Sequence, residues 1–428
     1  MTYEETIRYL YDSVPMFHKV GAVAYKEGLA NTHALDRHFG HPHRQFRTIH
    51  VAGTNGKGSC SHTLAAMLQA EGYRVGLYTS PHLVSFRERI KVNGVPVSED
   101  YVVRFVESER PFFEPLHPSF FELTTALAFK YFADRRVDIA VIEVGLGGRL
   151  DCTNIISPVL SVITNISLDH TQFLGDTLAK IASEKAGIIK PHTPVVIGEH
   201  TDETRAVFTA KAHQEQAPIY FAEDEKEIVS AEPQAAGGMS YTTKRYGKIE
   251  GELGGIYQTK NTATVLCAAK RLLDAGILTD SGRITTGIAK AASLTGLSGR
   301  WQKIQESPTV VCDTGHNTGG WMYLGKQLEM QKCRQMRIVF GMVDDKDIDS
   351  VMSLMPLNAV YYFTKASTHR AINERDVCRH GEAHGLKGTC HTDVKSAYTA
   401  AKADAGADDF IFVGGSSYVV ADFLTYCV

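Results

Sequence analysis

The residues best suited to chemistry form one glycine-rich segment, Gly53-Thr54-Asn55-Gly56-Lys57-Gly58-Ser59. It follows the strand-like run 48–51 and precedes a helical pattern with Leu64, Met67 and Leu68 on one face. A glycine-rich turn between a strand and a helix N-terminus offers backbone N–H groups to an anion, and a lysine there can reach the outer phosphates. We therefore predict that residues 54–59 bind a nucleoside triphosphate and that Lys57 is catalytic.

The segment departs from the general phosphate-loop pattern at two positions. Val51 stands where that pattern has glycine, and Gly58 stands where it has serine or threonine directly after the lysine. The first hydroxyl, on Ser59, therefore comes one residue late. Because Mg²⁺ needs an octahedral shell of oxygen ligands, its protein ligands are expected elsewhere in the chain. The alternative is a glycine-rich turn that binds no ligand.

Polar side chains that follow strand-like runs are candidates for those ligands, because ligands gather at the carboxyl ends of strands in parallel α/β sheets. Ser80 follows the run 74–78, Glu143 lies at the end of the run 138–144, and His170 follows a further apolar run. A hydroxyl, a carboxylate and an imidazole can complete the shell of a metal ion already bridged by triphosphate oxygens. The alternatives are a hydrogen-bonded structural histidine and a glutamate that caps the next turn.

Two further sets of residues have both a structural and a chemical interpretation. Lys185 lies in the last turn of a predicted helix, where a cation interacts favourably with the helix dipole. Asp313 and His316 follow another strand-like run and form either a polar turn or part of a site. Spacing alone leaves both interpretations open.

Composition limits the class of protein. A length of 428 residues exceeds the size at which one core keeps growing, so two domains are expected. A net charge of -3 gives no basic excess for binding nucleic acid. The eight cysteines include no C-x-x-C pair, which argues against a zinc site and a disulfide framework and fits a reducing compartment. Without a signal peptide or a run of ~20 apolar residues, the protein is expected to be cytoplasmic, with no membrane partner.

The elements that must position these residues form two α/β series. In the first, strand-like runs alternate with helical patterns, which predicts a mostly parallel sheet covered by helices on both faces. A helix is expected over 176–186, with Asp176 as its N-cap and Gly187 at its end, followed by a less regular stretch over 223–251 and a helix over 261–275. The strand-like runs of this series are 48–51, 74–78, 138–144, 159–163 and 194–197.

A second series begins near Val310, with strand-like runs at 310–312, 337–340, 360–363 and 410–413. The small, glycine-bearing segment 293–300 separates the two series and is typical of a domain hinge. We therefore expect an α/β protein with an N-terminal P-loop ATPase domain over 1–295, built on a mostly parallel sheet. A smaller, Rossmann-like α/β domain is expected over 296–428.

Taken together, these segments resemble the folylpolyglutamate synthase and dihydrofolate synthase family, which is related to the amino-acid ligases of cell-wall synthesis. The resemblance covers nearly the whole chain, and the order and spacing of its motifs make it specific. The motifs are the segments 53–59, 80–90, 119–122, 143–154, 168–175, 184–188 and 313–317.

The resemblance implies a nucleotide site with residues from both domains. Residues 53–59 would bind the ATP phosphates, and Asn261, Arg300 and Asp313 would make further ATP contacts. Lys185 matches the lysine that the family carbamylates, a modification that turns a cation into an anion able to orient a metal-bound ligand. The Mg²⁺ ligands would be Ser80, Glu143 and His170, and the family also implies a monovalent cation, K⁺.

The resemblance further implies two small-molecule substrates. The incoming L-glutamate would lie near His316 and Ser416. The pterin substrate, dihydropteroate or folate, would contact Ser119, Phe120, Phe121, Glu122, Leu150, Asp151 and Cys152.

The chain departs from the family pattern in two places. Thr314-Gly315 stands where Gly-Ala is usual, with Thr318 in place of proline, and Cys152 stands where alanine is common.

The expected reaction forms an acyl phosphate from ATP and the pterin carboxylate, which the amine of L-glutamate then attacks. Lys57 and Mg²⁺ would stabilise charge on the transferred group, and His316 would orient or deprotonate the amine. The alternatives are a cell-wall-type amino-acid ligase and a nucleotide-switched P-loop binding protein. The sequence leaves open whether one or both of the two activities are present, the polyglutamate chain length and the preferred folate form; a monomer is expected.

Overall fold

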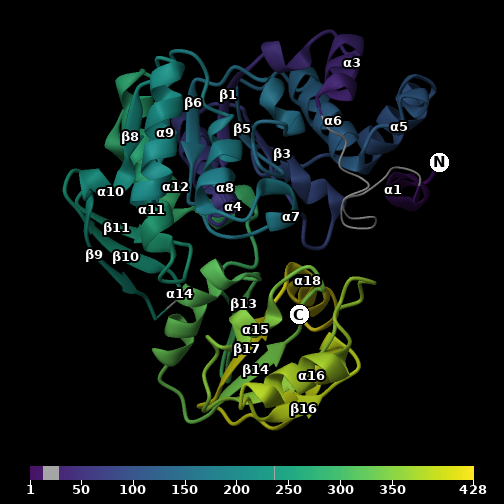
Figure 1. Ribbon diagram of the computed structural model, residues 1–428, viewed down its shortest axis with the longest axis vertical. Coiled ribbons are helices and arrows are strands. Elements are labelled where there is room, and N and C mark those ends of the chain that lie inside the picture. Colours follow the sequence, from purple (N-terminus) through teal and green to yellow (C-terminus); the bar gives the residue numbers. More distant parts are fainter. Residues whose placement is uncertain (13–27, 236) are drawn as a thin grey trace. The chain divides into compact units, whose positions relative to one another are not determined.

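The computed structural model describes residues 1–12, 28–235 and 237–428. Within these ranges the chain forms two compact units (Figure 1). The first contains Met1–Val229, Thr242–Ile249 and Thr259–Gly296, and the second contains Ser230–Tyr241, Glu250–Gln258 and Leu297–Val428. Each unit has its own hydrophobic core.

The first unit is built on a sheet with the strand order β4-β3-β2-β5-β1-β6-β7-β8. Strands β2, β5, β1, β6, β7 and β8 are parallel, whereas β3 is antiparallel to both of its neighbours. The expected mostly parallel sheet is therefore confirmed. The strands are β1 (Arg47–Ala52), β2 (Val75–Tyr78), β3 (Ile90–Val92), β4 (Val95–Pro96), β5 (Ile139–Glu143), β6 (Leu160–Ile163), β7 (Val195–Ile197) and β8 (Ile219–Phe221).

The central strands are apolar along almost their whole length, as strands covered on both faces must be. Every residue of β5 is buried, and its register with β1 pairs His50 with Ile142 and Val51 with Glu143. Because β1 and β5 are parallel neighbours, the loops that follow Ala52 and Glu143 leave the same edge of the sheet. The first unit therefore places the phosphate loop beside the glycine-rich turn that follows β5.

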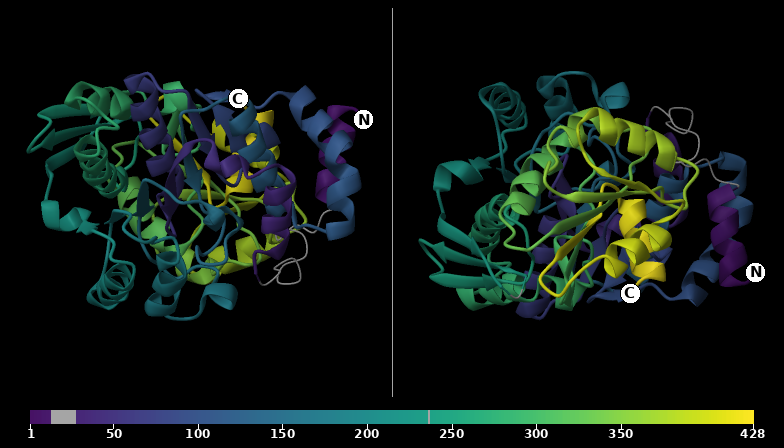
Figure 2. Two further views of the ribbon diagram at one scale, coloured as in Figure 1. Left: turned by 90° about the horizontal axis from the view of Figure 1, so that it is seen from above. Right: turned by 90° about the horizontal axis from the view of Figure 1, so that it is seen from below.

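Helices pack against this sheet. Helices α8 and α9 lie side by side (Figure 1), and α4 lies beside α12 and α13 and contacts β1, β2 and β5. The N-terminal helix α1 lies beside α5 (Figure 2). The helices are α1 (Tyr3–Asp12), α3 (Ala30–His38), α4 (Lys57–Glu71), α5 (Glu99–Phe113), α6 (Phe120–Asp134), α7 (Thr171–Leu174), α8 (Leu178–Ala186), α9 (Asp202–Gln214), α10 (Ala222–Glu225), α11 (Gln258–Asp274), α12 (Ser281–Ala289) and α13 (Ala291–Thr295), with short 3-10 turns η2 (Pro42–Arg44), η3 (Phe86–Arg89), η4 (Glu114–Leu116) and η5 (Cys152–Ile155).

Helix α8 begins two residues later than the sequence predicts, and its N-cap lies one residue later. Its N-cap is Thr177, whose hydroxyl accepts a hydrogen bond from the backbone N–H of Lys180 at 3.2 Å. The prediction of Asp176 as the cap is wrong, and its carboxylate instead pairs with Lys180 Nζ at 2.8 Å. Aspartate and threonine are both good caps, and an apolar stripe does not fix a helix end to one residue. Gly187 follows the helix as predicted.

The stretch 223–251, expected to be less regular, contains strands. They form a three-stranded sheet in the order β11-β10-β9. Buried Met239 and Tyr241 alternate with more exposed neighbours along β10, the period of a strand with one covered face. The strands are short and polar, so their alternation is weak in the sequence. Their bounds are β9 (Ile228–Pro233), β10 (Met239–Thr243) and β11 (Lys248–Gly251).

The second unit is built on a sheet with the strand order β12-β13-β17-β14-β15-β16. All neighbours from β13 to β16 are parallel, and β12 is antiparallel to β13. Trp321, Phe340 and Phe412 are fully buried in its core, and the expected separate α/β fold is confirmed. The elements are β12 (Gln302–Glu306), β13 (Thr309–Asp313), β14 (Met336–Phe340), β15 (Val360–Phe363), β16 (Gly388–Cys390), β17 (Phe410–Gly414), α14 (Thr318–Glu329), α15 (Ile348–Met352), α16 (Glu374–Ala383), α17 (Val394–Ala403) and α18 (Ser417–Tyr426).

Two expectations from composition concern cysteines and membranes. Cys378 on α16 and Cys390 at the end of β16 form a disulfide, with their Cα atoms 6.0 Å apart. The cysteine spacing argued against a disulfide framework, and this one pair departs from that expectation because the packing of α16 beside β16 brings the two residues together. In the described ranges, no helix is both long and apolar enough to cross a bilayer.

Candidate active site

The phosphate loop connects β1 to α4 through two glycines with positive φ. Gly53 has a φ of 148° and Gly56, the N-cap of α4, has a φ of 82°. A Cβ atom on Gly53 would lie 1.9 Å from Thr164 Oγ1, and one on Gly56 would lie 2.2 Å from Asn261 Oδ1. Only glycine fits both positions, and Asn261, a predicted ATP contact, does lie against the loop.

The segment after β6 holds this loop in shape. The backbone N–H of Thr54 donates to Asn165 O at 3.0 Å, and the N–H of Asn55 donates to Asn165 Oδ1 at 2.8 Å. Thr164 Oγ1 donates to Asn55 O. Thr164 and Asn165 were not among the predicted site residues, although they directly follow a predicted strand, as Ser80 and His170 do. They support the loop from the neighbouring strand.

Two lysine side chains meet at this loop. Lys57 Nζ donates to the carbonyl oxygens of Gly53 and Thr54, each at 3.1 Å, and Lys185 Nζ donates to the same Gly53 oxygen at 3.0 Å. Burial, and after it the charge of Lys57, lowers the pKa of Lys185 to about 7. The helix-dipole interpretation alone does not describe Lys185, because its amine contacts the phosphate loop and its pKa lies near neutral pH.

The three predicted metal ligands lie at or beyond the carboxyl ends of strands of the first sheet. Ser80 comes two residues after β2, Glu143 is the last residue of β5, and His170 is the N-cap of α7, beyond β6. In the described ranges, no group of three or more His, Cys, Asp or Glu side chains is arranged to hold a metal ion. The predicted set has two such side chains and a hydroxyl. A buried carboxylate at the strand beside the phosphate loop fits Mg²⁺ bound chiefly by nucleotide oxygens.

The glycine turn after β5 packs against the end of α8. A Cβ on Gly148 would lie 2.8 Å from Glu184 O and 3.0 Å from Lys185 O, so only glycine allows this approach. Arg149 donates to Glu184 through both its backbone N–H and its guanidinium. This packing fixes the last turn of α8, and with it Lys185, beside the loop.

Asp151 organises the same turn from within. Its buried carboxylate accepts hydrogen bonds from the backbone N–H groups of Gly145 at 3.0 Å, Leu146 at 2.8 Å and Thr153 at 3.0 Å, and from the Thr153 hydroxyl. Burial raises the pKa of Asp151, while these bonds act in the opposite direction. The next residue, Cys152, begins η5, and burial raises the pKa of its thiol.

The segment 119–122 starts helix α6. Ser119 is its N-cap: its hydroxyl accepts from Glu122 N at 3.2 Å, and the Glu122 carboxylate accepts from Ser119 N at 2.6 Å. Phe121 leaves no room for a side chain on Gly145, where a Cβ would lie 2.4 Å from its ring. Ser119 and Glu122 therefore have a structural role as a capping box, and Phe121 lies against the turn after β5. Their contact with a pterin stays a prediction.

In the second unit, Asp313 ends β13 in a buried position. Its carboxylate accepts from the Tyr257 hydroxyl at 2.5 Å, Trp301 N at 2.7 Å and Gly315 N at 2.8 Å. Burial raises the pKa of Asp313, and the nearby Arg300 charge opposes this. The sequence analysis missed Tyr257, which lies 56 residues away along the chain.

The other predicted residues of the second unit lie close to the ends of β13 and β17. The Arg300 guanidinium donates to Gly299 O at 3.1 Å and to the Thr314 hydroxyl. His316 Nδ1 lies 3.1 Å from Thr314 O, and Ser416 is the buried N-cap of α18. Because β13 and β17 are parallel neighbours, Asp313 and Ser416 belong to the same edge of their sheet.

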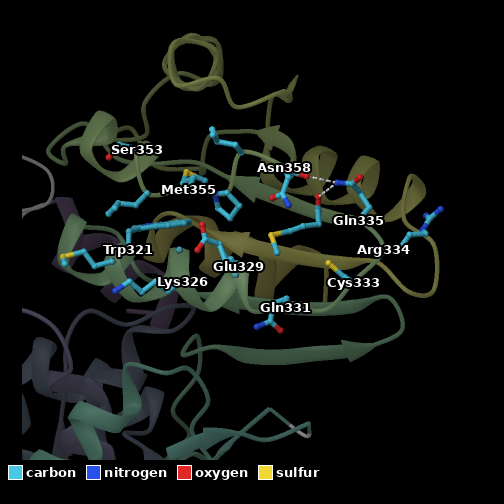
Figure 3. Close-up of a pocket in the computed structure, with 17 residues that line it drawn as sticks. Trp321, Lys326, Glu329, Gln331, Cys333, Arg334, Gln335, Ser353, Met355 and Asn358 are labelled. Carbon is cyan, nitrogen blue, oxygen red and sulfur yellow. Dashed lines mark hydrogen bonds between the residues drawn. The ribbon is translucent and has the colours of Figure 1, made fainter.

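The second unit also contains a cavity of about 740 Å³ (Figure 3). It is lined by α14 from Trp321 onward and by the segments before β14 and β15, including Gln335 and Asn358. These segments lie at the amino ends of the parallel strands, opposite the edge that carries Asp313. None of the predicted site residues lines this cavity, so its size does not mark the active site.

Comparison with known proteins agrees with the two-unit structure. Residues 51–269 match the Mur ligase middle domain, and residues 299–417 match the Mur ligase glutamate ligase domain. The chain is 34% identical over 410 residues to a dihydrofolate synthase/folylpolyglutamate synthase of Bacillus subtilis (strain 168), covering 93% of this chain and 94% of the relative.

Solved structures of relatives have the same fold over the whole chain. E. coli FolC in complex with DHPP and ADP superposes with a TM-score of 0.83 and 29% identity, over 99% of this chain and 97% of that one. A bifunctional folylpolyglutamate synthase/dihydrofolate synthase with Mn, AMPPNP and L-glutamate bound gives 0.80 and 27%, over 99% and 98%. With its phosphate loop, its paired lysines and both Mur ligase domains, the chain belongs to the folylpolyglutamate synthase and dihydrofolate synthase family.

Proposed function

We propose that the protein is an ATP-dependent ligase that joins L-glutamate to dihydropteroate, to tetrahydrofolate and its polyglutamates, or to both. The observation that supports this most directly is the meeting of Lys57 and Lys185 at the Gly53 carbonyl oxygen, at the start of α4. The positive dipole end of a helix and the Lys57 cation beside it suit a triphosphate, and the nearness of Lys57 disfavours a charge on Lys185. The choice of acceptor follows the relatives, one of which carries DHPP and ADP and another L-glutamate.

The reaction must first activate a carboxylate, because its negative charge repels an amine and its oxygen is a poor leaving group. The pterin carboxylate attacks the γ-phosphorus of ATP, and ADP leaves, which gives an acyl phosphate. The amine of L-glutamate then attacks the acyl carbon, loses a proton and displaces inorganic phosphate. Lys57 moves from the carbonyls of Gly53 and Thr54 to the γ-phosphate and stabilises its charge.

Ser80, Glu143 and His170 would hold Mg²⁺, which when bound neutralises charge on the triphosphate oxygens. Residues 54–59 and Asn261 bind the nucleotide from the first unit. K⁺ is proposed as a further cofactor, on the family resemblance alone. The relative with Mn and AMPPNP bound supports the use of a divalent ion with the nucleotide.

Lys185 is proposed to be carbamylated. Its lowered pKa, about 7, leaves a large share of the amine uncharged at neutral pH. The uncharged nitrogen can add to the carbon of CO₂ and lose a proton, which gives a carbamate. A carbamate would remove the repulsion between Lys185 and Lys57 and pair with the Lys57 cation instead.

The pterin and glutamate sites are proposed from the same resemblance. Ser119 to Glu122 and Leu150 to Cys152 would contact the pterin, Arg300 and Asp313 the nucleotide, and His316 and Ser416 the glutamate. We assign residues 1–295 to the ATP- and pterin-binding domain and 296–428 to the glutamate ligase domain, and the compact unit that contains the latter also includes 230–241 and 250–258. We further propose a cytoplasmic monomer that binds neither nucleic acid nor membranes.

The test is phosphate release with ATP, Mg²⁺ and L-glutamate, offering dihydropteroate and tetrahydrofolate in separate reactions and identifying products by mass spectrometry. Glutamate-dependent turnover with both acceptors establishes a bifunctional ligase. Turnover with one acceptor assigns that activity alone. Phosphate release without a glutamylated product from either acceptor contradicts the proposal and favours a different ligase substrate or a nucleotide switch.

A further inference from the structure

A histidine is buried in the middle of the first sheet, three residues before Gly53 along β1. The side chain of His50 is fully buried, and its Nε2 lies 2.9 Å from Thr153 Oγ1. Burial lowers the pKa of His50 to about 3, so the ring is neutral at physiological pH. A neutral imidazole has one N–H donor and one acceptor nitrogen, and the hydrogen bonds around it decide which is which.

The direction of these hydrogen bonds follows from the number of protons. Thr153 Oγ1 has one proton, which it donates to Asp151 Oδ1, so it must accept from His50 Nε2–H. The other ring nitrogen, His50 Nδ1, is then an acceptor; it is buried and has no hydrogen-bond partner within the described ranges. An unsatisfied buried nitrogen is costly, and a leucine would avoid that cost. The donor on Nε2 is therefore the property that distinguishes histidine at this position.

The chain of hydrogen bonds ends on the turn after β5. Asp151 Oδ1 accepts from the N–H and hydroxyl of Thr153, and Oδ2 accepts from the N–H groups of Gly145 and Leu146. These four donors fill the roughly four acceptor positions of a carboxylate. Both oxygens of Asp151 are thus fully hydrogen-bonded within the protein, and the carboxylate serves to hold the turn after β5 in place.

We propose that His50 and Thr153 are positioning residues that, through Asp151, set the Gly145–Leu146 turn at a fixed position beside the phosphate loop. His50 lies on β1, the strand that leads into Gly53, and Gly145 follows the neighbouring strand β5. The series of hydrogen bonds from His50 through Thr153 and Asp151 therefore connects the two loops at one edge of the sheet. This inference rests on the proposed function, in which Phe121, packed against Gly145, and residues 150–152, which follow the turn, contact the acceptor whose carboxylate is phosphorylated. A fixed turn holds that carboxylate within reach of the γ-phosphate.

Matched pairs of variants separate the loss of the Thr153 hydroxyl or the His50 N–H donor from a change in side-chain volume. Thr153→Val keeps the shape and removes the hydroxyl, whereas Thr153→Ser keeps the hydroxyl. His50→Leu removes the donor, whereas His50→Gln places an amide N–H at the same number of bonds from Cα. We expect the KM for the pterin substrate to rise about 10-fold in Thr153→Val and His50→Leu, with the KM for ATP changed by less than about 2-fold. Thr153→Ser and His50→Gln should restore most of the loss.

Three kinetic results would overturn the proposal: an unchanged pterin KM in Thr153→Val, equal losses in the valine and serine variants, or a parallel rise in the KM for ATP. A second readout does not depend on the substrate. Hydrogen exchange at the Gly145 and Leu146 amides should be about 10-fold faster in Thr153→Val than in Thr153→Ser. If the wild-type protein glutamylates neither acceptor, the proposed function fails, and exchange then decides on the positioning role: equal rates in the two variants refute it.

Discussion

Two lysines share one carbonyl oxygen at the phosphate loop, and they differ in burial. Lys57 is partly exposed at the start of α4, whereas Lys185 is only 4% exposed. The positive charge of Lys57 and the lack of solvent both disfavour a charge on Lys185. One lysine is therefore suited to stabilising phosphate charge and the other to reacting as an uncharged amine.

Replacing Lys57 by alanine should lower the rate of glutamate-dependent ADP formation by at least about 100-fold, because a cation aimed at the transferred phosphate is lost. The measurement is kcat with saturating ATP and acceptor. The matched control is Lys180→Ala, which removes an exposed lysine from α8 and should leave kcat unchanged. A Lys57→Ala protein with wild-type kcat would refute the catalytic role.

Lys185 should make stability depend on pH. Its pKa is about 7 in the folded protein and 10.5 without the fold, so the unfolded chain binds more protons between these values. The free energy of unfolding should therefore rise with pH across this range by up to about 1.4 kcal/mol per unit, relative to Lys185→Met. Lys185→Met should be the more stable protein at pH 7, with an advantage that shrinks by pH 9.

Urea unfolding of both proteins in CO₂-free buffer at pH 7, 8 and 9 measures this difference. Comparing the two proteins cancels the groups that they share. Lys180→Met serves as the control, since its side chain is exposed on the same helix. Parallel stability curves for wild type and Lys185→Met would show that the folded and unfolded chains protonate Lys185 alike.

At the scale of elements, α8 positions Lys185 through both of its ends. Thr177 caps its first turn, and the glycine turn after β5 packs against its last. Burial of Ile181, Ala182 and Ala186 fixes the face that the helix turns to the core. The position of the amine is thus a property of the helix as a unit.

Thr177→Ala should lower the free energy of unfolding by about 1 kcal/mol, because the first turn loses the side chain that accepts from Lys180 N. Asp176→Ala should leave it nearly unchanged, since Asp176 and Lys180 form an exposed pair that solvent screens. Urea unfolding followed by circular dichroism measures both. If Asp176→Ala is the more destabilised of the two, aspartate is the working cap in solution.

At the scale of the whole molecule, the second unit takes segments from three separate parts of the chain. Ile256 N donates to Gln327 Oε1 at 2.8 Å, and the Tyr257 hydroxyl donates to Asp313. Both donors precede the long segment Leu297–Val428. A division of the chain at a single point would therefore separate the second sheet from groups that satisfy its buried acceptors.

A fragment of residues 297–428 should unfold at a lower urea concentration than the second unit does in the full chain. The loss should be about 1–3 kcal/mol for the donor to Asp313 alone. Trp301 and Trp321, the chain's two tryptophans, are both buried in this unit, so their fluorescence reports on it in either protein. Tyr257→Phe in the full chain is the control and should reproduce part of the loss. Equal midpoints would show that residues 297–428 are self-sufficient.

The sequence by itself determined the features that depend on neighbouring residues. The phosphate loop is a contiguous glycine-rich segment, and the apolar runs of β1, β5, β13 and β17 predict parallel strands with polar residues at their ends. Local rules therefore sufficed for the fold class, and they also supplied the site residues that stay a prediction. They did not distinguish Thr177 from Asp176 as a cap, or reveal the weakly alternating strands β9 to β11.

Only the tertiary structure decided the properties that depend on burial and on distant partners. Lys185 is 132 residues from Gly53 along the chain, and its lowered pKa arises from the packing that brings them together. The saturation of Asp151 and the Tyr257 bond to Asp313 depend likewise on which loops meet. The spacing of residues in a sequence shows which types of side chain a site can contain. The dielectric environment and the partner that set their chemistry exist only once the chain has folded.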